Sequence, residues 1–295
     1  MDRLLHVFIT VAEQKNLTRA AEKSFITQSA VSQNIKLLEE HFNSKLLDRT
    51  NKRIQLTKSG EILYLHAKQI MKQYSLAGRM IDELKEGVSG PLTIGSGFTF
   101  GEYLLPTIIS AFILQHPKIN PKITIKNSIR IANQVKQKQL DIGIIEREMF
   151  DDELLTVPFA EDDMVVIVPK DFPLDNGAEI TVSELADLTW IIRESGSGTR
   201  QVTDTMFART QLAPKKLLEF GSTQVIKETV KKGIGISFMS KVSVKDEIDR
   251  GVMKALTIDT YKDSRTFYYV TNKSQHATKA LELFIQQIRE TSGRR

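Results

Sequence analysis

The chain has 295 residues, of which 41% are hydrophobic and 26% are charged. This composition is typical of a folded globular protein, and the length predicts two or more domains because a single core rarely grows this large. Cysteine is absent, which excludes disulfides, thiolate zinc sites and thiol catalysis. The apolar stretch near the N-terminus is too short for a signal peptide or a membrane span, so we expect a cytoplasmic protein.

The net charge of +5 is concentrated toward the N-terminus. Residues 1–90 hold 14 Lys and Arg against 10 Asp and Glu, whereas residues 91–295 hold 27 against 26. A basic segment suits a polyanion such as DNA because neutralised phosphates release counterions, although charge alone fits a solvated surface better. None of the 8 prolines precedes Pro91, so the first ninety residues can be mostly uninterrupted helix.

Three helices are predicted at the N-terminal end. The first covers residues 2–14, where apolar residues recur at helical spacing. Thr18 is the predicted N-cap of a short second helix, and Thr27 is the predicted N-cap of the third. The packed face of the third helix is predicted at Val31, Ile35, Leu38 and Phe42. This helix-turn-helix layout is the one in which a second helix enters the DNA major groove.

The opposite face of the third helix is polar and carries no acidic residue between Glu22 and Glu39. Gln can bond an adenine at two points and Ser can address a base or a phosphate, whereas a carboxylate would be repelled by the phosphates. The predicted DNA-facing set is Thr27, Gln28, Ser29, Ser32, Gln33 and Lys36. The alternative is a polar surface face without a partner.

A basic hairpin is predicted directly after this helix. Its strands cover residues 47–50 and 53–57 and flank Asn51-Lys52, a pair suited to a tight turn. Such a hairpin forms the wing of a winged helix. We expect Arg49, Lys52 and Arg53 to contact phosphate or the adjacent minor groove.

A long helix is predicted from the cap Thr57 to about Glu86. Apolar positions recur in it with alternating spacings of four and three, which is the seam of a coiled coil. These positions are Leu63, Ala67, Ile70, Tyr74, Ala77, Ile81 and Leu84. The seam predicts a homodimer that presents two recognition helices to a pseudo-palindromic site, and the alternative is a helix packed on its own domain.

After Pro91 short β-branched runs alternate with amphipathic helices, a pattern that predicts an α/β domain. Strands are expected over residues 92–95, 122–126, 142–145, 164–169, 190–193, 235–239 and 267–271, and helices over 101–115, 131–139, 182–186, 200–209, 224–232 and 277–290. The run at 164–169 begins a second lobe. Crossings between the two lobes are expected near residues 160–162 and 263–266.

Four turns rich in glycine and hydroxyl groups lie between predicted strands and helices: residues 95–102, 127–128, 194–200 and 220–224. Free N–H groups gather at such junctions and favour an anion. We therefore expect a small anionic or zwitterionic metabolite between the lobes. The predicted contacts are Ser96, Thr99, Phe100, Ser128, Ser195, Ser197, Thr199, Ser222 and Thr223. The alternative is that these residues only cap helices.

An enzyme is not expected. The glycine-rich turns lack a complete phosphate-binding fingerprint, and the five histidines have no metal-ligand spacing. The acidic runs at residues 151–153 and 161–163 are interpreted as solvated charge near a hinge. We predict no catalytic site, no metal and no cofactor.

The run from Phe8 to Leu63 resembles the DNA-binding region of the LysR-type transcriptional regulators. The resemblance is carried by Ala20-Ala21, Gln28-Ser29-Ala30-Val31-Ser32, Ile35, Leu38-Glu39, Leu46-Leu47, Arg49 and Leu56-Thr57-Ser59-Gly60. The chain length and the later domain pattern extend it over the whole chain.

The resemblance implies an α/β protein overall. It would have a winged helix-turn-helix over residues 1–58, a linker and dimerisation helix over 59–90, and an effector-binding domain over 91–295. The last would have two lobes like those of periplasmic binding proteins, lobe I at about 91–161 and 267–295 and lobe II at about 162–266. Dimers of this kind pair into tetramers, and RNA polymerase is an expected partner.

The function expected from these patterns is sequence-specific, metabolite-responsive control of transcription. Ligand would favour one closure state of the lobes and so alter the bending of bound DNA. A solute-binding protein built on the two-lobed domain and a ligand-independent architectural DNA-binding protein are the alternatives. The first would need an export signal, and the second would have no use for two hundred residues of α/β domain.

Overall fold

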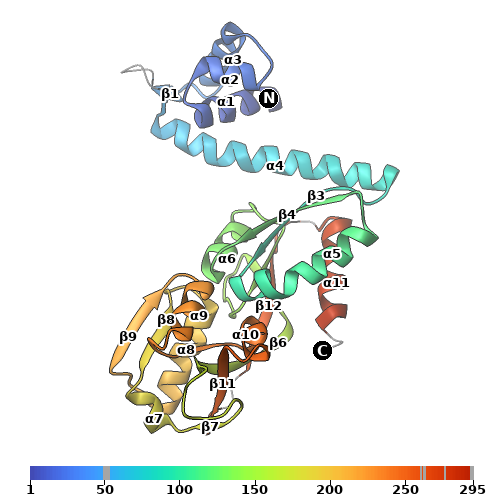
Figure 1. The fold of residues 1–295 in the computed structure, drawn as a ribbon. Helices are drawn as coiled ribbons and strands as arrows, with labels where there is room; N and C mark the ends of the chain where they lie inside the picture. The colour runs from blue at the N-terminus through green and yellow to red at the C-terminus, as the bar shows by residue number, and fades with distance from the viewer. Residues whose placement is uncertain (49–53, 260, 262–263, 276, 293–295) are drawn as a thin grey trace. The chain divides into compact units, whose positions relative to one another are not determined.

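The computed structural model describes residues 1–48, 54–259, 261, 264–275 and 277–292. The chain forms two compact units, Met1–Gly87 and Val88–Arg295, each with its own hydrophobic core (Figure 1). Among the described residues, no helix is both long enough and apolar enough to cross a membrane.

The N-terminal unit is a three-helix domain with a short hairpin and a long final helix. Its elements are α1 (Asp2–Gln14), α2 (Leu17–Lys23), α3 (Gln28–His41), β1 (Leu47–Asp48), β2 (Gln55–Leu56) and α4 (Lys58–Glu86). Phe8, Val31 and Ile35 are completely buried where α1 packs on α3. Strands β1 and β2 pair antiparallel, with Leu47 opposite Leu56. The predicted helix-turn-helix is confirmed, and the predicted hairpin is confirmed at its base, where the described strands are shorter than predicted. The tip of the hairpin, with Arg49, Lys52 and Arg53, lies outside the described residues.

The caps of these helices test the local predictions. Thr27 and Thr57 are confirmed as N-caps, because their hydroxyls accept the N–H groups of Ala30 at 3.2 Å and Gly60 at 3.0 Å. The prediction of Thr18 was wrong. Asn16 caps α2, and its Oδ1 accepts the N–H of Thr18 at 2.8 Å, because the side-chain oxygen of Asn reaches the first-turn amides as well as a hydroxyl does.

Two predicted contacts of the N-terminal helices also need correction. Phe42 is 47% exposed, because α3 ends at His41 and Phe42 leaves the packed face as its C-cap. In α4, Ala67 is completely buried in the core of its own unit and Leu63 packs against that core. Ala67 is therefore not available to a second copy. Ile70, Tyr74, Ala77 and Ile81 are exposed, and the side chain of Leu84 lies outside the described residues.

The C-terminal unit has two lobes. Lobe I contains β3 (Gly90–Ser96), η2 (Phe100–Leu104), α5 (Leu105–Gln115), β4 (Ile119–Ile125), α6 (Ser128–Lys136), β5 (Ile142–Ile145) and α11 (Lys279–Ser292). Lobe II contains β7 (Glu179–Ile180), α7 (Val182–Ala186), β8 (Thr189–Arg193), α8 (Gly198–Thr210), β9 (Lys216–Phe220), α9 (Thr223–Lys231), β10 (Ser237–Ser240), α10 (Lys241–Asp249) and β11 (Met253–Ile258). Two long strands, β6 (Leu154–Pro169) and β12 (Ser264–Asn272), run between the lobes.

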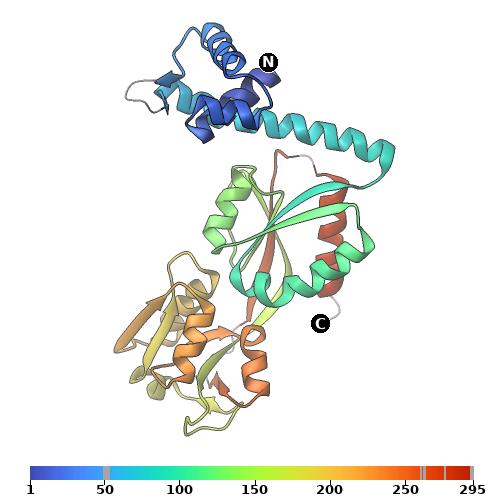
Figure 2. The same ribbon diagram turned by 45° about the horizontal axis from the view of Figure 1, so that its top comes forward.

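The sheet explains how the lobes are joined. Its strand order is β4-β3-β5-β12-β6-β11-β7, with β10 also paired to β6. The first part of β6 pairs with β12, and the second part, from Met164 on, pairs with β10 and β11. In lobe I, α6 covers one face of the sheet, and α5 with α11 covers the other (Figure 2). Both predicted crossings fall on these two long strands.

Several elements of lobe II escaped prediction, namely β7, β9, α10 and β11. In α10 only Val242, Val244 and Ile248 are apolar, so its helical period is weak in the sequence. In β9 the apolar residues Leu217 and Leu218 are adjacent and do not alternate with polar residues, so the strand pattern is weak. This strand pairs only with β8 among the described strands, and Leu217 is exposed. The other predicted elements of the C-terminal unit are present, with bounds that differ by a few residues, except that β6 begins at Leu154 and is much longer than predicted.

Candidate DNA-binding surface and effector site

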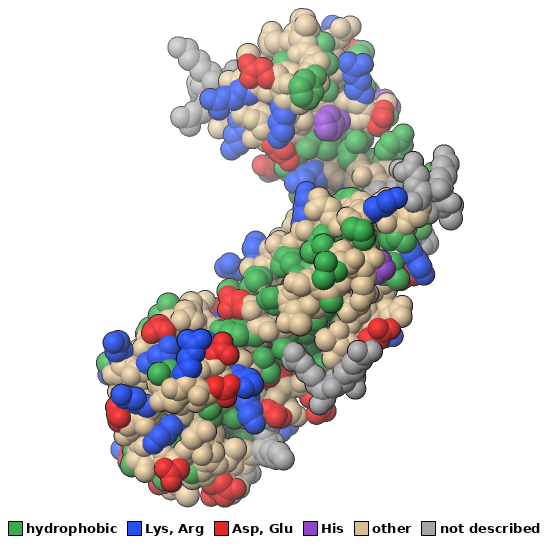
Figure 3. All heavy atoms as spheres, turned by 45° about the vertical axis from the view of Figure 1, so that its right-hand side comes forward, with side chains coloured by type: hydrophobic (Ala, Val, Ile, Leu, Met, Phe, Trp, Pro, Cys, Tyr) green, Lys and Arg blue, Asp and Glu red, His purple; other side chains and the backbone are tan. Residues whose placement is uncertain are grey.

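The polar face of α3 is directed to solvent. Gln28, Ser29, Gln33 and Lys36 are exposed, and Ser32 is half-buried. The Thr27 hydroxyl, besides capping the helix, lies 3.0 Å from the Ser29 hydroxyl. This part of the predicted set therefore forms one accessible ridge. On the face of the N-terminal unit that is visible in Figure 3, several Lys and Arg side chains are exposed.

Glu39, at the buried edge of α3, fixes the start of the hairpin. Its Oε1 accepts the N–H groups of Leu46 at 2.9 Å and Leu47 at 3.3 Å, and its Oε2 lies 3.0 Å from Lys45 Nζ. Burial acts to raise the pKa of Glu39, but these hydrogen bonds outweigh burial and lower it. Glu39 thus ties α3 to the start of the hairpin, a role that the sequence pattern did not reveal.

The base of the hairpin is closed by the first turn of α4. The Thr57 hydroxyl donates to the carbonyl of Lys45 at 2.6 Å. A Cβ at Gly60 would lie 2.0 Å from the carbonyl oxygen of Leu46, so only glycine allows the two backbones to approach this closely. Between α3 and β1 lies a surface hollow of about 560 Å³, lined by Ser32, Gln33, Lys36, Glu39, Lys45 and Leu47.

In the C-terminal unit, three of the four predicted turns converge on one residue, Glu146, and the first of them bonds its carboxylate. Glu146 follows β5 directly and its side chain is 2% exposed. Its Oε1 accepts the N–H groups of Thr99 at 2.7 Å and Phe100 at 3.3 Å, at the start of a helical run over residues 98–115. Its own N–H donates to the Ser128 hydroxyl at 3.3 Å.

Arg265, on the long strand β12, connects this carboxylate to the third turn. Its Nη1 donates to Glu146 Oε2 at 3.3 Å and to the Thr199 hydroxyl at 2.9 Å. Its Nε donates to Asp162 Oδ2 at 2.8 Å. Burial raises the pKa of Asp162, although Arg265 and Ser240 favour its charged form. Neither Glu146 nor Arg265 was predicted as a site residue.

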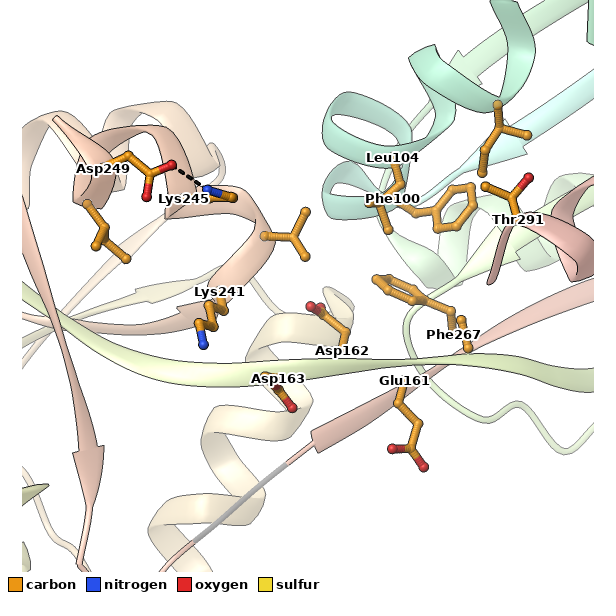
Figure 4. A pocket seen from close by; sticks show the side chains of 14 residues that line it. Phe100, Leu104, Glu161, Asp162, Asp163, Lys241, Lys245, Asp249, Phe267 and Thr291 are labelled. Atoms are coloured by element: carbon orange, nitrogen blue, oxygen red, sulfur yellow. Dashed lines mark hydrogen bonds and ion pairs between the residues drawn. The ribbon is translucent and has the colours of Figure 1, made fainter. Parts of the chain in front are cut away.

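The acidic run at residues 161–163 was interpreted as solvated charge, and this is wrong for Asp162. Alternate side chains of a strand point to opposite faces. Figure 4 shows Asp162 on one side of β6 and its neighbours Glu161 and Asp163 on the other. Only Asp162 is buried, and its Oδ1 accepts from the Ser240 hydroxyl at 2.7 Å.

The lobes touch each other at this junction. A Cβ at Gly198, the first residue of α8, would lie 2.5 Å from Glu146 Cβ and 2.6 Å from its carbonyl oxygen. The guanidinium of Arg193 lies over the Phe98 ring at 4.7 Å, and Lys227 Nζ lies 5.0 Å from the centre of the Tyr103 ring. These contacts join the two lobes.

The fourth turn does not reach Glu146. Thr223 is buried and its hydroxyl accepts from Arg193 Nη1 at 2.9 Å, whereas Ser222 caps α9 by accepting the N–H of Val225 at 3.4 Å. Ser195 is exposed and, with Ser197, borders a hollow of about 360 Å³ that Arg147 and Arg200 also line. The capping alternative therefore holds for Ser222, while Ser197 makes no side-chain capping bond.

Two buried polar atoms at the junction have no hydrogen-bond partner among the described residues. They are the Ser96 hydroxyl oxygen, at the end of β3, and Arg265 Nη2. Ser96 and Arg265 are 0% and 4% exposed. Buried polar groups are nearly always paired, and an acceptor from outside the chain, either water or a ligand, would satisfy these two atoms.

A larger cavity, of about 630 Å³, lies between the lobes next to this junction, and Asp162 is part of its lining. The rings of Phe100 and Phe267 face it, and Lys245, paired with Asp249, stands on the lobe II side (Figure 4). Of the predicted effector residues only Phe100 lines it, and the Phe100 ring belongs to the core of lobe I.

Comparison with known proteins identifies the family. A family model described as bacterial regulatory helix-turn-helix protein, lysR family, matches residues 3–61, and one described as LysR substrate binding domain matches residues 85–293. The HTH-type transcriptional regulator CysL of Bacillus subtilis is 36% identical over 286 residues, covering 97% of this chain and 96% of CysL. A probable RuBisCO transcriptional regulator of Phaeodactylum tricornutum is 29% identical over 292 residues, covering 97% and 95%.

Solved structures support the fold. A full-length OxyR variant from Pseudomonas aeruginosa has a TM-score of 0.74 at 23% identity, and the match covers 98% of this chain and 94% of OxyR. CbnR in complex with its target DNA has a TM-score of 0.73 at 19% identity, and the match covers 99% of each chain. The named relatives are regulators, as predicted, rather than enzymes. The chain therefore belongs to the LysR-type family of DNA-binding transcriptional regulators, with an N-terminal helix-turn-helix and a C-terminal effector-binding domain.

Proposed function

We propose that this regulator responds to a small anionic or zwitterionic metabolite bound where the turns of lobes I and II meet. The observation that carries the proposal is the pair of unpartnered buried polar atoms, Ser96 Oγ and Arg265 Nη2, beside a helix N-terminus. Leaving such donors unpaired costs free energy that an acceptor-rich ligand would recover.

A relative supports a small ligand in this domain. The regulatory domain of CcmR from Synechocystis PCC6803 was solved in complex with 2-PG. It is 26% identical to this chain, has a TM-score of 0.64, and covers 69% of this chain and 98% of its own. The name 2-PG belongs to CcmR alone, and for this chain the ligand is assigned only by chemical class.

The oligomeric state and the target belong to the same proposal. In α4, Ile70, Tyr74 and Ile81 are 52%, 66% and 53% exposed, which leaves an apolar stripe for a second copy. We infer a homodimer that pairs into a tetramer, acts in the cytoplasm on a pseudo-palindromic operator and contacts RNA polymerase. Its recognition surface would be the exposed ridge of α3, Gln28, Ser29, Ser32, Gln33 and Lys36, with Thr27 at its start.

Replacing Ser96 with Ala tests the effector proposal with little risk to folding, because the Ser96 hydroxyl makes no hydrogen bond that the substitution would break among the described residues. Thermal-shift titration of the full chain with sulfate, phosphate and acetate should show weaker stabilisation of Ser96→Ala than of the wild type. Ser110→Ala is the control, since Ser110 is exposed on α5 and bonds only to the Pro106 carbonyl at 2.7 Å among the described residues. Equal stabilisation of all three proteins would contradict the proposal.

A further inference from the structure

The junction that we assign to the effector already holds an anion, the side chain of Glu146. Its Oε1 accepts hydrogen bonds from the N–H groups of Thr99 and Phe100 at the start of the helical run, at 2.7 and 3.3 Å. A Cβ at Gly97 would lie 2.7 Å from the same oxygen, so the loop before the helix wraps closely around the carboxylate. The site is thus built to bind a carboxylate, and the chain supplies one itself.

Arg265 supplies the buried positive charge that an anion-binding site needs. It is 4% exposed and contacts Glu146 through Nη1 at 3.3 Å, while Nη2 has no partner among the described residues. A guanidinium presents its N–H donors in a planar fork that suits two oxygens of one anion. The contact to Glu146 therefore uses only part of what Arg265 can offer.

An external anion cannot use the same N–H groups while Glu146 holds them. Each backbone N–H is a single donor, and two carboxylates sharing one site repel each other strongly in a buried environment. A ligand that enters must either avoid the helix N-terminus or move the Glu146 carboxylate away from it.

We propose that Glu146 is an internal competitor for the effector site, and that a small oxyanion acts on this regulator by displacing its carboxylate. This rests on the proposed anionic effector. The ligand class is a carboxylate, sulfate or phosphate group small enough for the space that one carboxylate fills. The Glu146 side chain lowers the apparent affinity of every such ligand, because the ligand can bind only when the carboxylate has left the site.

The same residue links ligand binding to the contact between the lobes. The Glu146 backbone packs against Gly198, at the N-terminus of α8 in lobe II, closely enough that a Cβ there would lie 2.6 Å from the Glu146 carbonyl oxygen. The Thr199 hydroxyl shares Arg265 Nη1 with Glu146. Displacing the carboxylate therefore changes the bonds that join lobe II to β12. The ligand would then bind two arrangements of the lobes with different affinity and shift the equilibrium between them.

Isothermal titration calorimetry of the full chain with sulfate, in chloride buffer of constant ionic strength, tests this directly. Glu146→Gln keeps the size of the side chain and removes its charge. We expect it to bind sulfate about tenfold or more tightly than the wild type, because the competing state is weakened. Glu148→Gln removes the same charge from an exposed residue of the same loop, and should bind sulfate as the wild type does.

The outcomes separate the inference from the proposed function. Equal or weaker sulfate binding by folded Glu146→Gln, with clear binding by the wild type, would overturn the competitor role and leave the anionic effector standing. No binding of sulfate, phosphate or acetate by either protein, while both still bind DNA, would overturn the anionic effector and this inference together. Circular dichroism establishes that the variants are folded.

A structure of the wild-type chain crystallised with sulfate serves if Glu146→Gln does not fold. The inference expects sulfate on the N–H groups of Thr99 and Phe100, with the Glu146 side chain turned away. The crystals should contain about 100 mM sulfate, which exceeds the millimolar effective concentration that is typical of a tethered group. A Glu146 side chain that has not moved under these conditions would contradict the inference, and so would sulfate bound only at surface lysines.

Discussion

The polar ridge of α3 and the junction between the lobes are built from the same kinds of side chain, which are exposed at the ridge and buried at the junction. On α3, Gln28 and Gln33 are exposed and, among the described residues, have no side-chain hydrogen bond to lose when they meet a partner. At the junction, Thr99, Ser128 and Thr199 are almost fully buried among groups bonded to Glu146 and Arg265. Under these proposals DNA would meet a free surface, whereas a small ligand would have to replace contacts that the protein already makes.

The largest effect is expected from breaking the buried pair at the junction. Arg265→Gln leaves Glu146 and Asp162 without their counter-charge, and removing one partner of a buried ion pair costs about 3–5 kcal/mol. Chemical denaturation should show this loss in the unfolding transition of the C-terminal unit. Arg209→Gln, which alters an exposed arginine of α8, should stay within about 0.5 kcal/mol of the wild type. A similar stability for both variants would mean that the junction is open and solvated.

A second substitution tests the rigidity behind the exposed ridge. Gly60→Ala places a methyl 2.0 Å from the Leu46 carbonyl oxygen, and forcing the two backbones apart should cost about 1–3 kcal/mol. The midpoint temperature of thermal unfolding and the affinity for a DNA duplex should both fall, because the hairpin is held by this contact. In the same helix, Gly78→Ala meets no atom within 4 Å in the single chain and should gain about 0.5–1 kcal/mol. Loss of dimer in Gly78→Ala would instead reveal a partner helix at that point.

Gln33→Ala sharpens the contrast between the free surface and the buried one. If Gln33 reads a base at two points, its removal should cost about 1–3 kcal/mol on a duplex enriched from a random pool and little on a scrambled duplex. Lys36→Ala should weaken binding to both duplexes equally, and it should reduce the slope of log affinity against log salt concentration by about one. Fluorescence anisotropy at several salt concentrations measures both effects. An equal loss on the two duplexes for Gln33→Ala would move this residue to the phosphate contacts.

The smallest effect concerns pH and the buried end of the recognition helix. The pKa of Glu39 is lowered in the folded chain, since the N–H groups of Leu46 and Leu47 and the Lys45 ammonium outweigh its burial. A carboxylate with a lowered pKa stabilises the fold fully above its ordinary pKa, and this stability is lost as pH falls through the folded value. Stability of the N-terminal unit should decline below about pH 4.3, and less steeply in Glu39→Gln. Identical pH profiles would leave Glu39 with no electrostatic role.

Local patterns in the sequence predicted much of the fold, and the exceptions have a physical cause. The caps Thr27 and Thr57 and the strand at Ile142–Ile145 depend on neighbouring residues, and they are found as predicted. The contact of Arg265 with Glu146 joins residues 119 positions apart, so no local period could indicate it. A polar residue directly after a buried strand was the one available signal for Glu146.

The same limit explains the mixed outcome in α4. The seven-residue period is real, but a period does not say which partner covers the stripe. Its first part, at Ala67, is covered by the core of its own unit, while Ile70, Tyr74 and Ile81 remain exposed. Likewise, the alternation that buries Asp162 and exposes Asp163 becomes readable only when the strand crossing is known.

We propose that the exposed polar ridge of α3 is the surface that reads DNA. A structure of the full chain bound to a duplex enriched from a random pool tests it most directly. We predict α3 in the major groove, with the Gln33 amide within hydrogen-bonding distance of a base edge and a second copy on the symmetry-related half-site. A bound complex in which the Gln28, Ser32 and Gln33 side chains face solvent would contradict the account.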